Sequence, residues 1–301
     1  MGPKTATFSG HKDCVYALCE GPSENEFFSS GADGWLVLWN VDEPEQGKLI
    51  ARMPSSVYAL HYFQEHHLIL VGVNQDGLHL IDLNSGNDIW NLPCPGVNWF
   101  RFGALDENQI LAAGSKGNLL LFNALTKSAT AIPSPASDIR ALSANLQSGL
   151  VATGSSDGHI RFFNSATKAE SADFSAHANT VFGLGWFPNG QYLVSCGRDA
   201  KLKLWNCESG GQPELEKEIP AHLFGIHDVK LHPSKPILAT GSTDKTIKIW
   251  DAENLNLLRV LDKSRHAGHG HSINQILWLG KRELLLSCSD DRTISAWDIY
   301  V

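Results

Sequence analysis

Histidine, serine and aspartate are the residue types of this chain that could support nucleophilic catalysis, and they recur together at constant spacing. A histidine precedes a hydroxyl residue by 18 positions, the hydroxyl precedes an aspartate by four, and the aspartate precedes a tryptophan by six. The sets are His11, Ser29, Asp33, Trp39; His177, Ser195, Asp199, Trp205; His222, Thr240, Asp244, Trp250; and His269, Ser287, Asp291, Trp297. In a hydrolase the imidazole takes a proton from the hydroxyl, and the carboxylate orients the imidazole. Four copies in one chain indicate a repeated structural unit rather than four catalytic triads.

The unit extends to three weaker copies that lie between the first and second strong ones. Each copy ends in an apolar residue followed by Asn or Asp. The pairs are Trp39-Asn40, Ile81-Asp82, Phe122-Asn123, Phe163-Asn164, Trp205-Asn206, Trp250-Asp251 and Trp297-Asp298. A repeat of about 43 residues accounts for the whole chain. The spacing therefore predicts a single domain of seven units over residues 1–301.

Within a unit, short apolar runs alternate with turn residues. In the sixth copy the runs cover 226–231, 237–242, 246–251 and 256–261, and Pro, Asp and Asn separate them. Short β-branched and aliphatic runs with such punctuation are typical of strands. Helical periodicity is not evident, and charged residues make up only 19% of the chain, below the roughly 25% of average domains. The sequence therefore predicts an all-β protein.

The Gly/Ala-His…Trp-Asp frame at this period resembles the WD40 repeat family over the entire chain. Copies 1, 5, 6 and 7 match it well, and copies 2 to 4 are degenerate. The resemblance implies a seven-bladed β-propeller with four antiparallel strands per blade around a central channel. It also implies a role for the repeated polar residues: histidine, hydroxyl, aspartate and tryptophan form one hydrogen-bonded network per blade, with the aspartate in the turn between the second and third strands.

Copies 2 to 4 lack this network. The positions of the turn aspartate and the strand-end tryptophan read Gln75 and Ile81, Lys116 and Phe122, and Asp157 and Phe163. We expect apolar packing to hold these blades, which should open more easily than the others.

The seventh copy contains only three strands before the sequence ends. A fourth strand is needed, because an unpaired edge invites aggregation. Residues 4–8 precede Gly10-His11 as other fourth strands precede their histidines. We therefore expect residues 4–8 to pair beside residues 293–299 and close the ring.

In WD40 proteins the second residue of each inner strand lies near the channel mouth, on the face that carries the aspartate turns. We call these residues the second-position residues: Tyr16, Tyr58, Asn98, Arg140, Phe182, His227 and Asn274. In the third copy Trp99 is an alternative to Asn98. Aromatic and arginine side chains are enriched at binding hot spots, so this set predicts partner binding. The alternative is that the side chains only plug the channel.

Other candidate sites are weaker. Trp35, two residues after an aspartate turn, could extend the surface or pack within its strand. The run 265–272 is rich in histidine, but His269 already belongs to a network, so a solvated loop is favoured over a metal site. The second-position residues include no Asp or Glu, and Asp138 lies just before the inner strand of the fourth copy. The sequence therefore predicts no catalytic residue, metal or cofactor. The connections 207–218 and 262–272 are the next candidates for partner binding.

Charge argues against direct nucleic-acid binding. The formal net charge is −8, whereas binding to phosphates requires a basic surface. Lysines and an arginine do gather near the turns of copies 5 to 7, where solvated turns explain them or an acidic peptide could bind. They are Lys201, Lys203, Lys245, Lys248 and Arg292.

Taken together, the residues and the resemblance predict a non-catalytic scaffold that binds peptides or protein subunits through its channel mouth and is monomeric within a larger complex. Substrate recognition for a ubiquitin ligase is an alternative, although residues 250–253 and 297–300 lack the Arg of the Trp-Asp-x-Arg pattern. Membership of an RNA-processing or chromatin complex is another. No apolar run is long enough to span a membrane. The six cysteines form no Cys-x-x-Cys pair and the N-terminus is polar, so we expect a cytoplasmic protein, with the nucleus as alternative.

Overall fold

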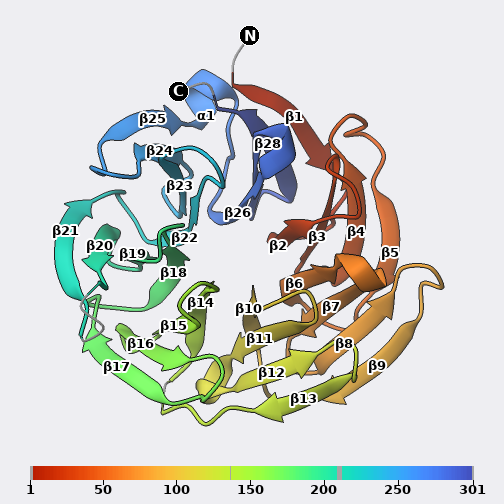
Figure 1. The fold of residues 1–301 in the computed structure, drawn as a ribbon. Helices are drawn as coiled ribbons and strands as arrows, with labels where there is room; N and C mark the ends of the chain where they lie inside the picture. The colour runs from red at the N-terminus through yellow and green to blue at the C-terminus, as the bar shows by residue number, and fades with distance from the viewer. Residues whose placement is uncertain (1–2, 136, 209–211, 300–301) are drawn as a thin grey trace. The chain divides into compact units, whose positions relative to one another are not determined.

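The computed structural model describes residues 3–135, 137–208 and 212–299, and most of them lie in β-strands (Figure 1). The strands form seven four-stranded sheets, one for each predicted blade. Blades 1 to 3 comprise β2 (Val15–Glu20), β3 (Glu26–Gly31), β4 (Trp35–Asn40) and β5 (Lys48–Arg52); β6 (Val57–Phe63), β7 (Leu68–Val73), β8 (Gly77–Asp82) and β9 (Asp88–Pro93); and β10 (Trp99–Ala104), β11 (Gln109–Gly114), β12 (Leu119–Asn123) and β13 (Ser128–Ala131). The seven-bladed, all-β prediction is confirmed.

The remaining blades repeat this order. Blades 4 and 5 comprise β14 (Ile139–Asn145), β15 (Leu150–Ser155), β16 (His159–Asn164) and β17 (Glu170–Ser175); and β18 (Val181–Trp186), β19 (Tyr192–Gly197), β20 (Lys201–Asn206) and β21 (Glu214–Pro220). Blades 6 and 7 comprise β22 (Ile226–Leu231), β23 (Ile237–Ser242), β24 (Ile247–Asp251) and β25 (Leu257–Leu261); and β26 (Ile273–Leu279), β27 (Leu284–Ser289), β28 (Thr293–Asp298) and β1 (Lys4–Ser9).

The chain forms two compact units, one of Met1–Trp99 with His232–Val301 and one of Phe100–Leu231. Blades 1, 2 and 7 belong wholly to the first unit, and blades 4 and 5 belong wholly to the second. The boundaries fall within β10 and between β22 and β23. A single domain over residues 1–301 remains a prediction.

The second strands are the most deeply buried elements. All six residues of β7 and of β23 are buried. Continuous apolar runs such as Leu-Ile-Leu-Val are typical of strands that are covered on both faces. The small Gly241 of β23 leaves room for a neighbouring strand, because a Cβ at this position would lie 2.7 Å from Ile273 Cγ2.

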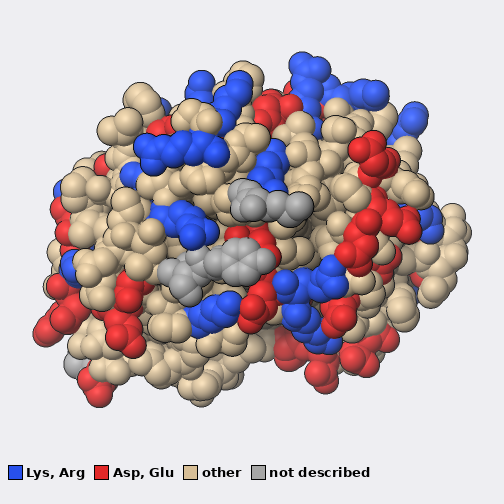
Figure 2. Space-filling model, turned by 90° about the horizontal axis from the view of Figure 1, so that it is seen from above, with Lys and Arg blue, Asp and Glu red and all other residues tan. Residues whose placement is uncertain are grey.

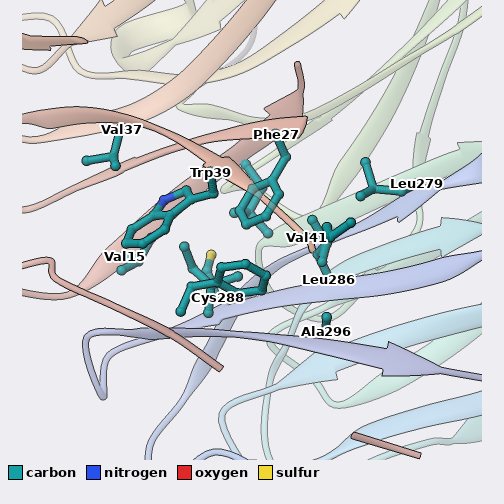
Figure 3. Packing of buried hydrophobic residues seen from close by; sticks show 12 residues of the cluster. Val15, Phe27, Val37, Trp39, Val41, Leu279, Leu286, Cys288 and Ala296 are labelled. Atoms are coloured by element: carbon teal, nitrogen blue, oxygen red, sulfur yellow. The ribbon is translucent and has the colours of Figure 1, made fainter. Parts of the chain in front are cut away.

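Figure 3 shows how blades 1 and 7 pack together in the first unit. Phe27 and Trp39 from blade 1 meet Leu286 and Cys288 from blade 7 in one buried cluster. Phe8 of β1 joins them, with its ring 5.0 Å from the Phe27 ring. Each such side chain contributes about 1.5–3 kcal/mol when it is fully buried.

The N-terminal strand completes the last blade, as expected. β1 lies antiparallel beside β28, where Phe8 is opposite Ile294 and Ser9 is opposite Thr293 (Figure 1). The predicted range of 4–8 extends by one residue. Within the first unit the edge of β28 is therefore covered rather than left unpaired.

Each aspartate turn between a second and a third strand places one residue in the left-handed region. That residue is Gly34 in blade 1 (φ 68°) and Ala200, Lys245 and Arg292 in blades 5 to 7 (φ 62°, 71° and 70°). Non-glycine residues adopt this conformation at a cost. The aspartate stabilises the turn, because its carboxylate accepts a backbone N–H from two residues further on, as Asp291 does from Thr293 N at 3.1 Å.

Over the described residues, helix is confined to single turns. They are α1 (Lys263–His266), η1 (Gln64–His66), η2 (Ser115–Gly117) and η3 (Gly280–Arg282). In the part of the chain that the structure describes, no helix is long and apolar enough to cross a membrane. The six cysteines are free thiols, and Cys196 and Cys288 are buried in β19 and β27.

Candidate interaction surface

Three of the four predicted networks are complete. In blade 1, His11 contacts Asp33 through Nδ1 at 2.9 Å and Ser29 Oγ through Nε2 at 2.7 Å, and Trp39 Nε1 donates to Ser29 Oγ at 2.8 Å. The same three contacts join His177 with Asp199 and Ser195, and His269 with Asp291 and Ser287, at 2.8–3.0 Å. The indoles of Trp205 and Trp297 complete them at 2.8 Å.

Part of the fourth network lies within the first unit. Trp250 Nε1 donates to Thr240 Oγ1 at 2.9 Å. Asp244 accepts from Thr246 Oγ1 at 2.6 Å. His222 belongs to the second unit, so the complete network of blade 6 remains a prediction.

Three turn aspartates, Asp33, Asp199 and Asp291, are held in their charged form. Burial by itself raises the pKa of the carboxyls of Asp33, Asp199 and Asp291. Hydrogen bonds from the histidines and from backbone N–H groups outweigh burial, so the pKa of each lies below its ordinary value. These residues therefore stabilise blades, and Ser29, Ser195 and Ser287, at 0% exposure, are inaccessible to a substrate.

Blades 2 and 4 contain polar networks of a different composition, which the sequence prediction of purely apolar packing missed. In blade 2, His79 lies between Asp76 and Asp88, at 2.6 Å from each carboxylate. In blade 4, the largely buried Arg161 bonds Asp157 at 2.9 Å and Asp173 at 3.2 Å. These contacts replace the missing histidine and tryptophan because other side chains of the same turn and strands supply the donors.

The second-position residues share a backbone feature that their sequence does not display. In five first strands the register against the second strand shifts at this position, so that the residue is the extra one of a β-bulge. These residues are Tyr16, Tyr58, Arg140, Phe182 and Asn274. A bulge leaves its residue out of the strand ladder and redirects the side chain, and bulges are over-represented beside active sites.

The side chains at these positions are all partly exposed. In β2, β6 and β14 the residues on both sides are buried. In blade 3 the partly exposed residue is Asn98, whereas Trp99 is 0% exposed. Asn98 lies one residue before β10 rather than inside a strand as expected, and its Oδ1 accepts from Gln75 Nε2 at 2.8 Å.

In the first unit, Tyr16 and Tyr58 stack with ring centroids 4.5 Å apart. Burial, followed by the neighbouring Tyr58, raises the pKa of Tyr16, so its hydroxyl stays protonated. Asn274 Nδ2 donates to Val15 O at 2.9 Å and to Asp290 Oδ1 at 2.8 Å. The aromatic pair therefore presents two polar hydroxyls on a flat apolar body, a combination that suits binding.

In the second unit, four side chains from four blades form a continuous stack. The Arg140 guanidinium lies 3.9 Å from the Phe100 ring centroid and 5.6 Å from that of Phe182. The Phe182 ring stacks on His227 at 5.1 Å. Three of these are second-position residues, and Phe100 was not predicted. We call Phe100, Arg140, Phe182 and His227 the cation–aromatic stack.

An arginine beside this stack was also missed. Arg101 donates to His227 O at 3.1 Å and lies 3.5 Å from the Asp228 carboxylate, which is 2% exposed. The sequence contained a signal for it, because Asp228 is an acidic residue at a strand position that is alanine or glycine in most other copies. A buried carboxylate requires a partner.

The other sequence candidates have ordinary surroundings. The Arg52 guanidinium lies 5.2 Å from the Trp35 ring, which is partly exposed. Lys201 and Lys203 pair with Glu218, the latter at 2.7 Å. Figure 2 shows basic and acidic side chains interspersed on the side in view. Within 3–135, 137–208 and 212–299, no group of three or more His, Cys, Asp or Glu is arranged to hold a metal ion.

The two long connections differ in what the structure describes. Part of 207–218 falls on residues 209–211, which lie outside the described residues. The connection 262–272 contains α1, whose N-terminal Asp262 accepts from Arg265 N at 2.8 Å. Among their described residues, neither connection gathers aromatic and cationic side chains as the second-position residues do.

Comparison with known proteins gives one family. The family model described as "WD domain, G-beta repeat" matches residues 2–40, 127–164, 169–206, 213–251 and 260–298. These ranges cover copies 1 and 4 to 7 and leave out copies 2 and 3.

Several curated proteins are similar to this chain. A striatin homolog of Dictyostelium discoideum is 26% identical over 80% of this chain and 26% of its own length. Human striatin is 27% identical over 81% of this chain and 34% of its own length. An Arabidopsis thaliana protein, transcriptional corepressor LEUNIG_HOMOLOG, is 39% identical over 40% of this chain and 15% of its own length. The chain thus spans about a third or less of these relatives.

Among solved structures, the WD40 β-propeller domain of Doa1 is similar over 100% of this chain and 97% of that chain, with a TM-score of 0.86 and 18% identity. At this identity the likeness concerns the fold alone, and it identifies the seven sheets as the blades of a β-propeller.

Proposed function

Because the chain belongs to the WD domain, G-beta repeat family, we propose that it is a non-catalytic scaffold that binds peptides or subunits of a protein complex through its second-position residues. The observation that carries this proposal is the shared β-bulge. In each of five blades the bulge leaves one residue out of the backbone hydrogen-bond ladder and redirects its side chain. Plugging a channel would not require tyrosine, arginine and histidine to remain partly exposed.

The chemistry of the positions supports protein partners. Tyrosine and phenylalanine bury large areas with little loss of rotamer freedom, and arginine adds directional hydrogen bonds to carbonyls or carboxylates. The net charge of −8 argues against nucleic acid as a direct partner. We further propose that the protein is cytoplasmic or nuclear. We also propose that it is monomeric within a larger complex.

The test replaces Tyr16, Arg140 and Phe182 by alanine in one variant. Proteins that co-purify with the tagged wild type are compared with those of the variant by quantitative mass spectrometry. We expect the recovered amount of each specific partner to fall at least about tenfold. The melting temperature of the variant should change little, because these side chains are outside the blade networks.

The matched control is Leu125→Ala with Leu146→Ala, two side chains that are 62% and 66% exposed in the turns at the opposite strand ends. The control should retain all partners. Retained binding with a large fall in melting temperature of the triple variant would identify the second-position residues as a plug. Retained binding with unchanged stability would move the site to 207–218 or 262–272.

A further inference from the structure

The loop between β21 and β22 exposes two large apolar side chains. Leu223 is 84% exposed and Phe224 is 61% exposed. The two residues that precede them are anchored, because Ala221 N and His222 N donate to Ala200 O at 3.0 and 3.3 Å. Because the loop is fixed at its base, the exposure belongs to a defined shape rather than to a frayed segment.

The repeat itself does not require apolar residues here. After the network histidine, the other strong copies read Lys12-Asp13, Ala178-Asn179 and Gly270-His271. Those loops serve the same network with polar or small residues. Leu223 and Phe224 are therefore a feature of this blade alone among the four, and their exposure needs another explanation.

An arginine lies on the turn against which this loop packs. A Cβ placed on Gly225 would lie 3.3 Å from Arg198 Cα, so the loop packs directly on the turn that carries Arg198. The Arg198 side chain is exposed and, among the described residues, makes no ion pair. The neighbouring Asp199 is already engaged by His177.

The loop is continuous with the cation–aromatic stack. His227 follows Phe224 by three residues and stacks on Phe182, which in turn lies 5.6 Å from the Arg140 guanidinium. We therefore expect a segment that is bound at this loop to approach the aromatic and cationic side chains of the stack.

We propose that Leu223, Phe224 and Arg198 bind an extended partner peptide that carries a large apolar residue and an acidic residue within about three positions of each other. This inference rests on the proposed function and names the chemistry of its partner. Burial of Leu223 and Phe224 supplies affinity, and the unpaired guanidinium of Arg198 selects a carboxylate. An anionic lipid surface is disfavoured, because the net charge of the chain is −8.

The experiment selects random peptides displayed on phage against the wild-type chain and measures the binding of synthetic copies by fluorescence anisotropy. We expect the selected peptides to pair Asp or Glu with Leu, Ile, Phe or Trp. Leu223→Ala with Phe224→Ala, and separately Arg198→Glu, should each weaken binding at least about tenfold. A peptide with Lys in place of its acid should recover binding to R198E. Leu146→Ala, at similar exposure, should bind like the wild type.

Each outcome bears on the inference separately from the proposed function. One outcome would overturn the inference and leave the proposed function standing. In it, peptide binding is lost in the Tyr16, Arg140 and Phe182 variant but kept in the Leu223, Phe224 double variant and in R198E. Binding unaffected by any variant would overturn both. Failure to select any peptide, or binding of the wild type but not the loop variants to phosphatidylserine vesicles, would reject a peptide partner. Because Leu223 and Arg198 are exposed, all variants should keep the wild-type melting temperature.

Discussion

At the scale of residues, the histidine, hydroxyl and aspartate side chains of each network are hydrogen-bonded to one another. In blade 7, Ser287 Oγ accepts from Trp297 Nε1 and contacts His269 Nε2, both at 2.8 Å. A nucleophilic serine must instead approach a substrate, and Ser287 is 0% exposed. Histidine, serine and aspartate form a reactive triad in a hydrolase. In this protein the same three residue types form a buried network whose hydrogen bonds are all satisfied, and such a network rigidifies a blade.

Replacement of Asp291 by alanine should lower the free energy of unfolding at pH 7 by about 1–3 kcal/mol, because His269 and Thr293 lose their acceptor. The folded-state pKa of Asp291 lies below its ordinary value of 3.8, so its contribution to stability is complete above pH of about 4 and is lost as the pH falls through the folded pKa. Urea unfolding at several pH values should therefore show the difference between wild type and variant shrinking below pH of about 4. A difference that stays constant with pH would contradict this assignment.

At the scale of elements, the blades differ in what holds them. Blades 1, 5 and 7 have the complete network, and blades 2 and 4 have substitutes built on His79 and Arg161. In blade 3, Phe122 stands where a tryptophan would donate, and phenylalanine has no N–H. Its outer strand β13 is only four residues long and mostly exposed.

Native-state hydrogen exchange should therefore find the amides of β11 and β12 less protected than those of β27 and β28. The physical reason is that local opening requires less free energy where fewer buried polar contacts must break. We expect blades 2 and 4 to lie between blade 3 and blade 7. Equal protection in blades 3 and 7 would show that apolar packing alone sets blade stability.

At the scale of the whole molecule, the first and last strands are joined. β1 supplies the fourth strand of blade 7, and its Phe8 is 1% exposed in a cluster with Phe27 and Trp39. The completion of blade 7 by β1 therefore depends on side-chain packing as well as on backbone hydrogen bonds.

Deletion of residues 1–9 should lower the melting temperature by roughly 5–10 °C, because losing a buried phenylalanine alone costs about 3–5 kcal/mol. It should also promote self-association through the uncovered edge of β28. Scanning calorimetry with light scattering measures both. If residues 1–301 form one domain, the variant should still melt in a single transition at the lower temperature. Two transitions, of which only one moves, would show that the units Met1–Trp99 with His232–Val301 and Phe100–Leu231 unfold independently.

Much of the fold could be predicted from the sequence because its defining interactions are local. The network histidine and aspartate are only 22 residues apart and lie in every strong copy at the same spacing. A repeated spacing therefore predicts the blade, its turn and the hydrogen bonds within it. The pairing of β1 with β28 followed from counting strands, since only one segment could complete blade 7.

The contacts among the side chains of the candidate interaction surface could not be predicted from the sequence, because they depend on tertiary structure. Arg101 and His227 are 126 residues apart, and the stack of Phe100, Arg140 and Phe182 joins strands from different blades. The sequence placed the second-position residues at equivalent positions, but not their bulges or their contacts. Which side chains touch depends on strand register and on the packing of one blade against the next, and a one-residue shift in register moves a side chain to the other face of its sheet.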